Sequence, residues 1–399
     1  MDRHMRFGQP SLFDEERLSW EAALELTAQS LNAYARRYKH WAIAYSGGKD
    51  STATVSVIVH LLNTGAIPSP QTLTVLYADT RMELPPLYHA AMRMLEHLRR
   101  QGIKTQIVLP NMEDRFFVYM LGRGVPPPSN TFRWCTGQLK IEPMIASLRR
   151  LRESTGEKLL MLTGVRLGES AARDSRIALS CGKNGSECGQ GWFQESTPSS
   201  VADTLAPLLH WRICFVWDWL YFMAQDLTGL PTRLVAETYG AGSGDKADAI
   251  EANLRTGCVG CNLAARDVAL ESVIKQAAWS HLSPLMELRP LYAELKKPSN
   301  RLRKDGTETR KDGSLVANPC RMGPLTFEAR LWALDRVKDI QRRARVDLIN
   351  IEEETMIRAL IAAKTWPRGW SGSEPVASAP FVNVNPDGSM QPVMEALLA

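Results

Sequence analysis

The segment Trp41-Ala42-Ile43-Ala44-Tyr45-Ser46-Gly47-Gly48-Lys49-Asp50-Ser51 determines the fold that we expect for this chain. Its first five residues form an apolar run of strand length, and two glycines follow after Ser46. From Asp50 to Leu62 the pattern becomes helical. A strand, a glycine turn and a helix in this order open a βαβ unit.

The same alternation continues along the chain. Apolar runs of strand length occupy residues 73–77, 105–109 and 158–164, and helical patterns occupy residues 84–100 and 139–152. Buried strands that alternate with helices are typical of a parallel sheet covered on both faces. We therefore predict an α/β fold with a twisted, mostly parallel sheet and helices on both of its faces.

The pattern changes near residue 240, so we place an α/β domain at residues 1–240. No strand is expected after it. Residues 241–365 have helical composition, interrupted at 296–321 by a polar loop with eight Lys/Arg and three acidic residues. That loop is either a set of phosphate contacts or a solvated insertion. The segment 366–399 is rich in Ser, Pro, Gly and Val and is predicted to be a poorly ordered tail.

Composition excludes some function classes. No stretch of about 18 uncharged apolar residues occurs, so we expect no membrane contact. The first ten residues lack the apolar core of a signal peptide, and the chain has seven cysteines. We therefore expect a cytoplasmic protein whose cysteines are thiols or metal ligands. The net charge of +5 permits contact with a polyanion without requiring it.

The glycine turn has the features of a phosphate-binding loop. Gly47 and Gly48 let the backbone approach a phosphate closely, and the positive end of the next helix faces the same anion. Lys49 and the hydroxyls of Ser46 and Ser51 add donors, and Asp50 is a candidate ligand for Mg²⁺. The alternative is a glycine turn at a sheet edge.

Further polar residues follow the predicted strands. Asp79 and Arg166 lie just after strand ends, as Ser46 does, and should converge on one crevice. Arginines suit a polyphosphate because a guanidinium donates two parallel hydrogen bonds to phosphate oxygens. Candidates for this role are Arg133, Arg166 and Arg173, with Glu169 orienting one of them; the alternative for each is a surface ion pair.

Two cysteine pairs lie in glycine-containing segments. Cys258 and Cys261 form a C-x-x-C, which is either a metal knuckle or a redox pair, and Cys181 and Cys188 bracket a polar loop. Four such thiols suit a tetrahedral site for a [4Fe–4S] cluster or for zinc. Cys214, in an apolar helical stretch, is expected to pack in the core.

The loop lacks the Gly-x-x-x-x-Gly-Lys-Ser/Thr pattern of Walker loops. Every fixed position of Ser-Gly-Gly-x-Asp-Ser is present at residues 46–51, and the chain therefore resembles the pyrophosphatase-loop superfamily, with its adenine nucleotide alpha hydrolase-like fold. Three segments resemble phosphoadenosine-phosphosulfate (PAPS) reductase-like proteins of that superfamily: Arg133–Pro143, Gly164–Arg173 and Pro207–Leu220.

This resemblance implies that ATP is cleaved between its α and β phosphates with the help of Mg²⁺. The residues that it makes catalytic are Ser46, Lys49, Asp50, Arg166 and Cys135. The residues that it places around ATP are the loop 46–51, Asp79, Arg133, Arg166, Glu169 and Arg173.

The same resemblance bears on the metal site. Relatives carry iron–sulfur clusters, which favours a cluster over zinc. Cys135 falls where some sulfonucleotide reductases have a cluster ligand, so either Cys135 or Cys181 completes the set, or Cys135 is a sulfur-carrying nucleophile.

The C-terminal half narrows the resemblance. The segments 254–261 and 323–330 resemble the DndC/SspD-like subfamily of DNA phosphorothioation proteins. This implies an ATP pyrophosphatase and adenylating sulfurtransferase that activates a DNA backbone phosphate. Its partners would be DNA, a cysteine desulfurase that donates sulfur, and other phosphorothioation proteins. The chain departs from the subfamily in lacking cysteines shortly upstream of Cys258.

Three alternatives remain. A phosphoadenosine or adenosine phosphosulfate reductase would usually need a nucleophilic cysteine in a C-terminal tail, and residues 321–399 contain none. A tRNA thiolase would use the same adenylation chemistry on another acceptor. A nucleotide-sensing scaffold without catalysis would need no intact loop.

Overall fold

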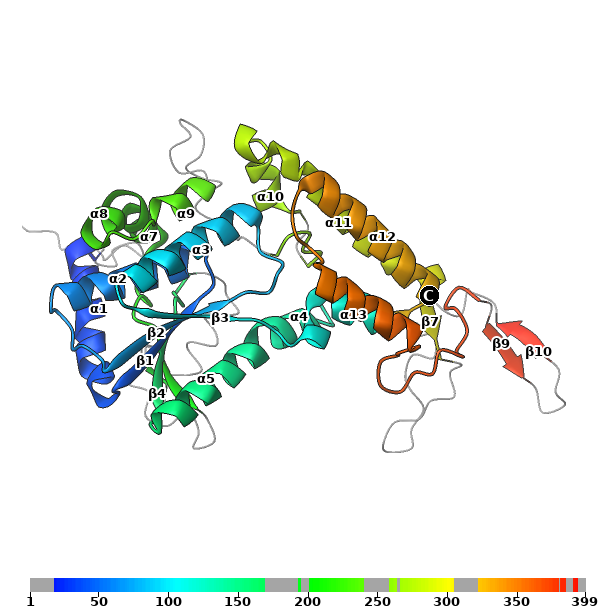
Figure 1. Ribbon diagram of the computed structural model, residues 1–399, viewed down its shortest axis with the longest axis horizontal. Coiled ribbons are helices and arrows are strands. Elements are labelled where there is room, and N and C mark those ends of the chain that lie inside the picture. The colour runs from blue at the N-terminus through cyan, green and yellow to red at the C-terminus, as the bar shows by residue number, and fades with distance from the viewer. Residues whose placement is uncertain are drawn as a thin grey trace, which may run out of the picture.

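The computed structural model describes residues 18–168, 193–194, 201–239, 258–263, 266–304, 322–379, 381–384 and 390–393. Figure 1 shows a sheet flanked by helices at one end of the molecule and a group of long helices at the other.

The sheet has the parallel topology that the sequence predicts. Its strand order is β3-β2-β1-β4-β6-β5. All neighbouring pairs are parallel except β5 with β6 at one edge. The strands are β1 (His40–Tyr45), β2 (Thr72–Ala78), β3 (Lys104–Val108), β4 (Leu159–Leu162), β5 (Phe193–Gln194) and β6 (Ala202–Leu205).

Helices cover both faces of this sheet. On one face, Trp41, Ile43 and Tyr45 of β1 point into a core shared with the first three helices and with the helices that follow the sheet. On the other face, Ala42 packs with residues of α5. The helices are α1 (Trp20–Tyr34), α2 (Lys49–Asn63), α3 (Pro85–Arg100), α5 (Glu142–Thr155), α7 (Ile213–Asp218), α8 (Ala224–Thr228) and α9 (Arg233–Thr238).

The C-terminal part is mainly helical, as expected. Its helices are α10 (Val268–Val273), η6 (Ala277–Glu287), α11 (Leu288–Leu295), α12 (Phe327–Ala344) and α13 (Ile351–Ala362). The expectation that no strand follows residue 240 was wrong: β7 (Arg301–Arg303) pairs with β8 (Met322–Leu325), and β9 (Phe381–Val384) pairs with β10 (Met390–Val393). Among the described residues, no helix is both long and apolar enough to cross a membrane.

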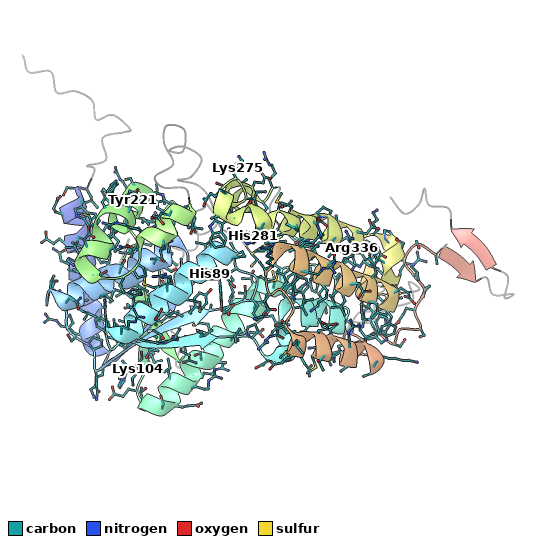
Figure 2. All side chains as sticks on the ribbon, turned by 45° about the horizontal axis from the view of Figure 1, so that its top comes forward. His89, Lys104, Tyr221, Lys275, His281 and Arg336 are labelled. Atoms are coloured by element: carbon teal, nitrogen blue, oxygen red, sulfur yellow. The ribbon has the colours of Figure 1, made fainter. Side chains whose placement is uncertain are left out.

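The N-terminal half contributes a segment to the core of the C-terminal helices. Residues 112–141 contain the short helical turns η3 (Val118–Gly122), α4 (Trp134–Thr136) and η4 (Gly137–Ile141). The buried Phe117, Met120 and Leu139 of this segment belong to the same apolar cluster as residues of α11 and α12. On another side of the junction, His89 of α3 stacks against Trp279 of η6, and Figure 2 labels His89 and His281 there.

Residues 366–379, which the sequence analysis assigned to the tail, pack on this helical part. The fully buried Arg330 donates hydrogen bonds to the carbonyl oxygens of Leu325 (3.0 Å), Gly122 (3.3 Å) and Thr365 (2.8 Å). The ring of Trp366 covers its guanidinium at 4.2 Å. A buried cation therefore joins η3, β8 and the start of this segment.

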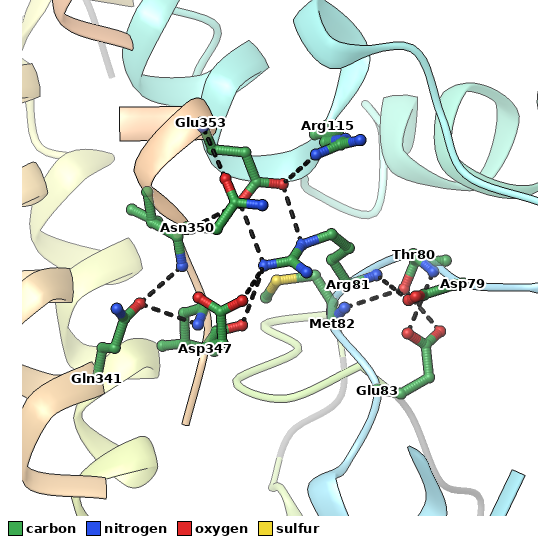
Figure 3. Close-up of polar contacts among 12 residues, drawn as sticks. Asp79, Thr80, Arg81, Met82, Glu83, Arg115, Gln341, Asp347, Asn350 and Glu353 are labelled. Carbon is green, nitrogen blue, oxygen red and sulfur yellow. Dashed lines mark hydrogen bonds and ion pairs between the residues drawn. The ribbon is translucent and has the colours of Figure 1, made fainter. Parts of the chain in front are cut away.

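A second polar junction connects the end of β2 to α13 (Figure 3). Glu353, only 3% exposed, forms ion pairs with Arg81 (Nε to Oε1, 3.0 Å) and Arg115 (Nη1 to Oε1, 3.2 Å). Its carboxylate also completes a capping box with Asn350 at the start of α13. Arg81 additionally pairs with Asp347 at 2.8 Å. One buried carboxylate thus ties two arginines and a helix terminus together.

We expect Glu353→Ala to lower the free energy of unfolding by about 3 kcal/mol, because it removes the ion-pair partner of Arg115, one of the two partners of Arg81, and the capping box of α13. Urea titration followed by circular dichroism measures this change. The matched control is Glu352→Ala, which removes an exposed carboxylate one residue away and should change the stability by no more than about 0.5 kcal/mol. Equal effects of the two variants would contradict the assignment.

Candidate active site

The loop after β1 has the geometry of an anion cradle. Gly47 adopts φ +75°, and a Cβ at this position would lie 3.1 Å from the Cβ of Ala91. Gly48 precedes α2 and has no side chain that could cap the first N–H groups of the helix. Ser51 Oγ donates to the Gly48 carbonyl at 3.0 Å and lies 3.1 Å from Ser46 Oγ. The loop is therefore held closed by its own hydroxyls: Ser51 Oγ also accepts the Ser46 N–H at 3.2 Å, and no N-cap side chain bonds to the first N–H groups of α2.

Arg166 reaches this loop from the segment after β4. Its Nε donates to Asp50 Oδ1 at 2.5 Å, its Nη1 donates to the Trp211 carbonyl at 3.0 Å, and the residue is 4% exposed. The other oxygen of Asp50 is paired with Lys49 Nζ at 3.1 Å. Gly164 permits this approach, since a Cβ there would lie 2.9 Å from the Asp50 carbonyl. The expected convergence of Arg166 on the loop is therefore present.

Asp79 lies at the end of β2, the strand next to β1, as predicted. Its Oδ1 accepts the backbone N–H of Arg81 at 2.8 Å, and Arg81 adopts a left-handed φ of 60° (Figure 3). Both carboxylate oxygens of Asp50 are paired with cations, whereas the described contacts of Asp79 involve only one of its oxygens, which accepts a backbone N–H. Asp79 is therefore the carboxylate better placed to accept a cation in this arrangement.

The other predicted phosphate ligands are not joined to the loop by the described contacts. Arg133 is exposed and donates to Asn130 Oδ1 at 3.0 Å, in the segment before α4. Glu169 and Arg173 lie outside the described residues, and so do Cys181 and Cys188.

Three cysteines from distant parts of the sequence come close to one another. Cys135 of α4 and Cys261 interact electrostatically, and Cys258 interacts with both. Burial raises the pKa of Cys258 to about 11, and the Lys140 ammonium opposes this shift. Burial also raises the pKa of Cys135, with the neighbouring Cys261 adding to the effect. The thiols are near neighbours, and soft thiolates are the ligands that zinc and iron–sulfur clusters use.

The side chains of these cysteines are not arranged in a geometry that would bind a metal ion. Within the described ranges, no three His, Cys, Asp or Glu side chains are grouped so as to hold a metal ion. The donor set nevertheless fits a thiolate centre, and it contains Cys135, the alternative that the sequence left open. Cys214 is exposed on α7, so the prediction that it packs in the core was wrong.

A hydrogen bond connects the cysteine segment to the residues that follow β2. Met82 lies three residues after Asp79, and its carbonyl oxygen accepts the N–H of Val259 at 2.7 Å. Glu83 is the next residue and is partly buried; desolvation raises its pKa, and the charge of Lys140 opposes that rise. Thr80 donates to Glu83 from its hydroxyl at 2.7 Å and from its backbone N–H at 3.1 Å.

Glu83, Lys140 and Tyr239 are the site residues that the sequence analysis did not select. Tyr239 lies at the end of α9 with its ring centroid 5.8 Å from Lys49 Nζ. Lys140 lies within Arg133–Pro143, a segment that resembles PAPS reductase-like proteins, and this is the only sequence feature that pointed to one of the three residues. Their roles depend on tertiary contacts.

Residues 40–231 match the sequence model of the phosphoadenosine phosphosulfate reductase domain family. The chain contains a PAPS reductase-like domain. This domain comprises the whole parallel sheet, the phosphate loop, Arg166 and Cys135, and it ends within the helices that follow the sheet.

Two curated relatives are uncharacterized proteins of Methanocaldococcus jannaschii. One is 23% identical over 190 residues, covering 47% of this chain and 33% of its own length. The other is 23% identical over 205 residues, covering 49% of this chain and 41% of its own length. The chain thus spans well under half the length of the curated relatives it matches.

Solved structures with partial similarity come from several enzymes. PAPS reductase of Candida auris is 14% identical, with a TM-score of 0.32, 54% of this chain and 89% of that chain covered. FMN adenylyltransferase of Candida glabrata is 15% identical, with a TM-score of 0.33 and coverages of 51% and 57%. The U34-tRNA thiolase of Methanococcus maripaludis, solved with its [4Fe–4S] cluster, is 13% identical, with a TM-score of 0.34 and coverages of 69% and 82%.

Gly47→Ala should weaken ATP binding by at least about tenfold, because its Cβ strains the left-handed backbone and pushes the loop away from Ala91. Isothermal titration with ATP measures the loss. Gly65→Ala is the control: Gly65 has a similar φ of +69°, but a Cβ there meets nothing within 4 Å. That variant should bear the backbone strain and keep its ATP affinity; the same loss in both would rule out a specific role for the loop.

Proposed function

We propose that this protein cleaves ATP to AMP and pyrophosphate and uses the adenylyl group to activate a DNA backbone phosphate for sulfur incorporation. The observation that carries the proposal is the loop 46–51, with a left-handed Gly47, an uncapped start of α2, and Arg166 ion-paired to Asp50. The PAPS reductase-like domain supports nucleotide chemistry at this loop. The phosphorothioation role rests on the resemblance of the segments around Cys258 and Gly323.

The loop would bind the β and γ phosphates of ATP. Backbone N–H groups at the start of α2 point at the anion, and Lys49 supplies a positive charge. On binding, Lys49 exchanges part of its ion pair with Asp50 for phosphate oxygens. Arg166 then keeps Asp50 in place, since its guanidinium is also fixed by the Trp211 carbonyl.

A magnesium ion would be held by carboxylates from the end of β2 and from the first turn of α2. Oxygen ligands are those that Mg²⁺ prefers, and Asp79 offers them with Asp50 as the second candidate. When bound, the ion would neutralise charge on the leaving pyrophosphate.

The proposed reaction has three steps. A non-bridging oxygen of a DNA phosphate attacks the α-phosphorus of ATP, the bond to the β-phosphate breaks, and pyrophosphate leaves. The outer sulfur of a cysteine persulfide on a partner cysteine desulfurase then bonds to the activated DNA phosphorus, and AMP leaves with the original oxygen; a second thiol attacks the carrier sulfur and breaks the S–S bond, which leaves the phosphorothioate and a disulfide. The contribution of the protein is to position the reactants and to stabilise charge.

Cys135, Cys258 and Cys261 are the described residues that would hold a [4Fe–4S] cluster in this scheme, with Cys181 or Cys188 as candidates for a further ligand. Such a cluster would supply an iron centre able to carry sulfur. The hydrogen bond from the Val259 N–H to the Met82 carbonyl, three residues beyond Asp79, supports a position of these thiols near the proposed nucleotide site.

The purified protein, incubated with ATP and Mg²⁺, should form AMP and pyrophosphate in equal amounts. Asp50→Ala should lower the rate at least about a hundredfold, because it frees Arg166 and Lys49 to move away from their catalytic positions. Anion-exchange chromatography of the nucleotides measures both. Asp226→Ala removes a mostly exposed carboxylate on α8 and should leave the rate unchanged. Formation of ADP and phosphate alone would refute the proposal.

The acceptor is tested by mass spectrometry of nucleosides from cells that contain or lack this protein. Phosphorothioate-linked dinucleotides should appear in digested DNA from cells with the wild-type chain or Asp226→Ala, and not with Asp50→Ala. Thiolated tRNA nucleosides that follow the same pattern, in place of the DNA product, would reassign the acceptor to tRNA.

Anaerobically purified protein should contain iron, and Ser replacements of Cys135, Cys258 and Cys261 should each remove most of it, because oxygen is a poor substitute for a soft thiolate. Elemental analysis and the visible absorption spectrum measure the loss. Cys214→Ser is the matched control, since its thiol is exposed on α7 away from the other three. Zinc without iron in the wild-type protein would contradict the cluster.

A further inference from the structure

A pocket of about 730 Å³ opens on the helical side of the molecule, apart from the phosphate loop. Its walls come from residues 125–132, from the β7–β8 hairpin and from residues 367–370. The volume falls within the range of roughly 300–1,000 Å³ that is usual for small-molecule sites. It therefore has room for a group the size of a nucleotide.

The charged residues that line this pocket are all basic. Lys296, Arg301 and Arg368 contribute to it, and no Asp or Glu is among its described lining residues. The guanidinium of Arg301 donates to the carbonyl oxygens of Met322 (2.9 Å) and Gly323 (2.7 Å). Burial lowers the pKa of Arg301 to about 10, which still leaves it charged at neutral pH. A pocket with this charge favours an anionic occupant.

Aromatic rings complete the lining. Tyr119, Phe132 and Trp370 contribute to the walls, and Phe132 is 47% exposed. Trp370 lies directly on Gly323, because a Cβ built on that glycine would be 2.0 Å from the ring. Rings next to cations are the combination by which proteins bind single-stranded nucleic acids, with bases stacking on the rings and phosphates meeting the cations.

We propose that this pocket binds a nucleotide of a single-stranded nucleic acid, its base against Phe132 and Trp370 and its phosphate near Lys296, Arg301 and Arg368. In a duplex both faces of a base are covered by its neighbours, so a strand must be single or have an extruded base to use these rings. DNA and RNA share this chemistry.

One wall of the pocket is connected to the segments that carry the cysteines. Its wall at residues 125–132 runs into α4, which carries Cys135. Trp134 Nε1 donates to the Pro126 carbonyl at 3.1 Å, and Asn262 Nδ2 donates to the Pro128 carbonyl at 2.9 Å. Asn262 directly follows Cys261. The view that the bound strand is the acceptor of sulfur rests on the proposed function; the binding itself does not.

The test is fluorescence anisotropy with a fluorescein-labelled ten-nucleotide oligothymidylate, measured on the full chain without ATP. Phe132→Ala should weaken binding about tenfold, from the loss of one stacked base. Trp370→Phe keeps a ring and should retain binding. Phe222→Ala removes a ring that is 64% exposed on the sheet domain, and should have no effect.

The salt dependence of the same binding tests the cations. Arg368→Gln should reduce the slope of log K against log salt by about 0.7, the value for one phosphate contact on a single strand. Lys275→Gln is the control, because Lys275 lies just after α10 at the surface, outside the pocket (Figure 2). An unchanged slope for Arg368→Gln would overturn the phosphate assignment.

Three comparisons complete the experiment. Tighter binding of the ten-nucleotide single strand than of the matched duplex supports the proposal, and the reverse overturns it. A ribonucleotide strand of the same length identifies the source, since the tighter of the two single strands is the ligand. Asp50→Ala should bind the strand as the wild type does, so a failure of ATP cleavage and a failure of this pocket are separate results. If Phe132→Ala bound the single strand with wild-type affinity, the proposal would be wrong.

Discussion

The ion pairs of Glu353 with Arg81 and Arg115 are the constraint on which the arrangement of the site depends. Arg81 has a left-handed conformation and lies between Asp79, at the end of β2, and Met82, whose carbonyl accepts the N–H of Val259. Such a conformation is costly for a residue with a side chain and persists where the surroundings fix it. The buried carboxylate on α13 fixes the side chain of Arg81, so the C-terminal helices constrain the segment after β2 that carries Asp79, a predicted nucleotide ligand.

Sequence alone identified the sheet because its strands are apolar runs that end at chemically informative residues. The first four parallel strands and the helices between them lie where periodicity placed them. β6 was missed because it is short and carries Asp203, which reads as polar and exposed. In the structure this carboxylate is 2% exposed and paired with Lys158 at 2.8 Å. The β7–β8 pair was missed because its charged residues resemble a loop, although Arg303 is buried.

The parts of the candidate site that are contiguous in sequence could be predicted best, and contacts between distant residues least. The loop 46–51 is contiguous, and its geometry follows from glycine and the start of a helix. The pairing of Arg166 with Asp50 spans 116 residues and was anticipated from parallel topology, since strand ends share one edge. The grouping of Cys135 with Cys258 and Cys261 obeys no such rule. It depends on residues 112–141 leaving the α/β half to pack among helices more than a hundred residues later, which neither periodicity nor spacing encodes.

Because residues 112–141 pack among the C-terminal helices, the two halves of the chain depend on each other for stability. Phe117, Met120 and Leu139 would be exposed in an isolated α/β half, and α12 would lose the partners of its apolar face. Each fully buried side chain of this kind contributes roughly 1.5–3 kcal/mol through burial, so a cut near residue 240 exposes an amount comparable to the whole stability of a domain. One apolar cluster therefore includes residues from both sides of the boundary predicted near residue 240. The segment that joins the halves also carries Cys135 and one wall of the basic pocket. Packing that stabilises the fold thus also fixes the positions of Cys135 and of this wall of the pocket.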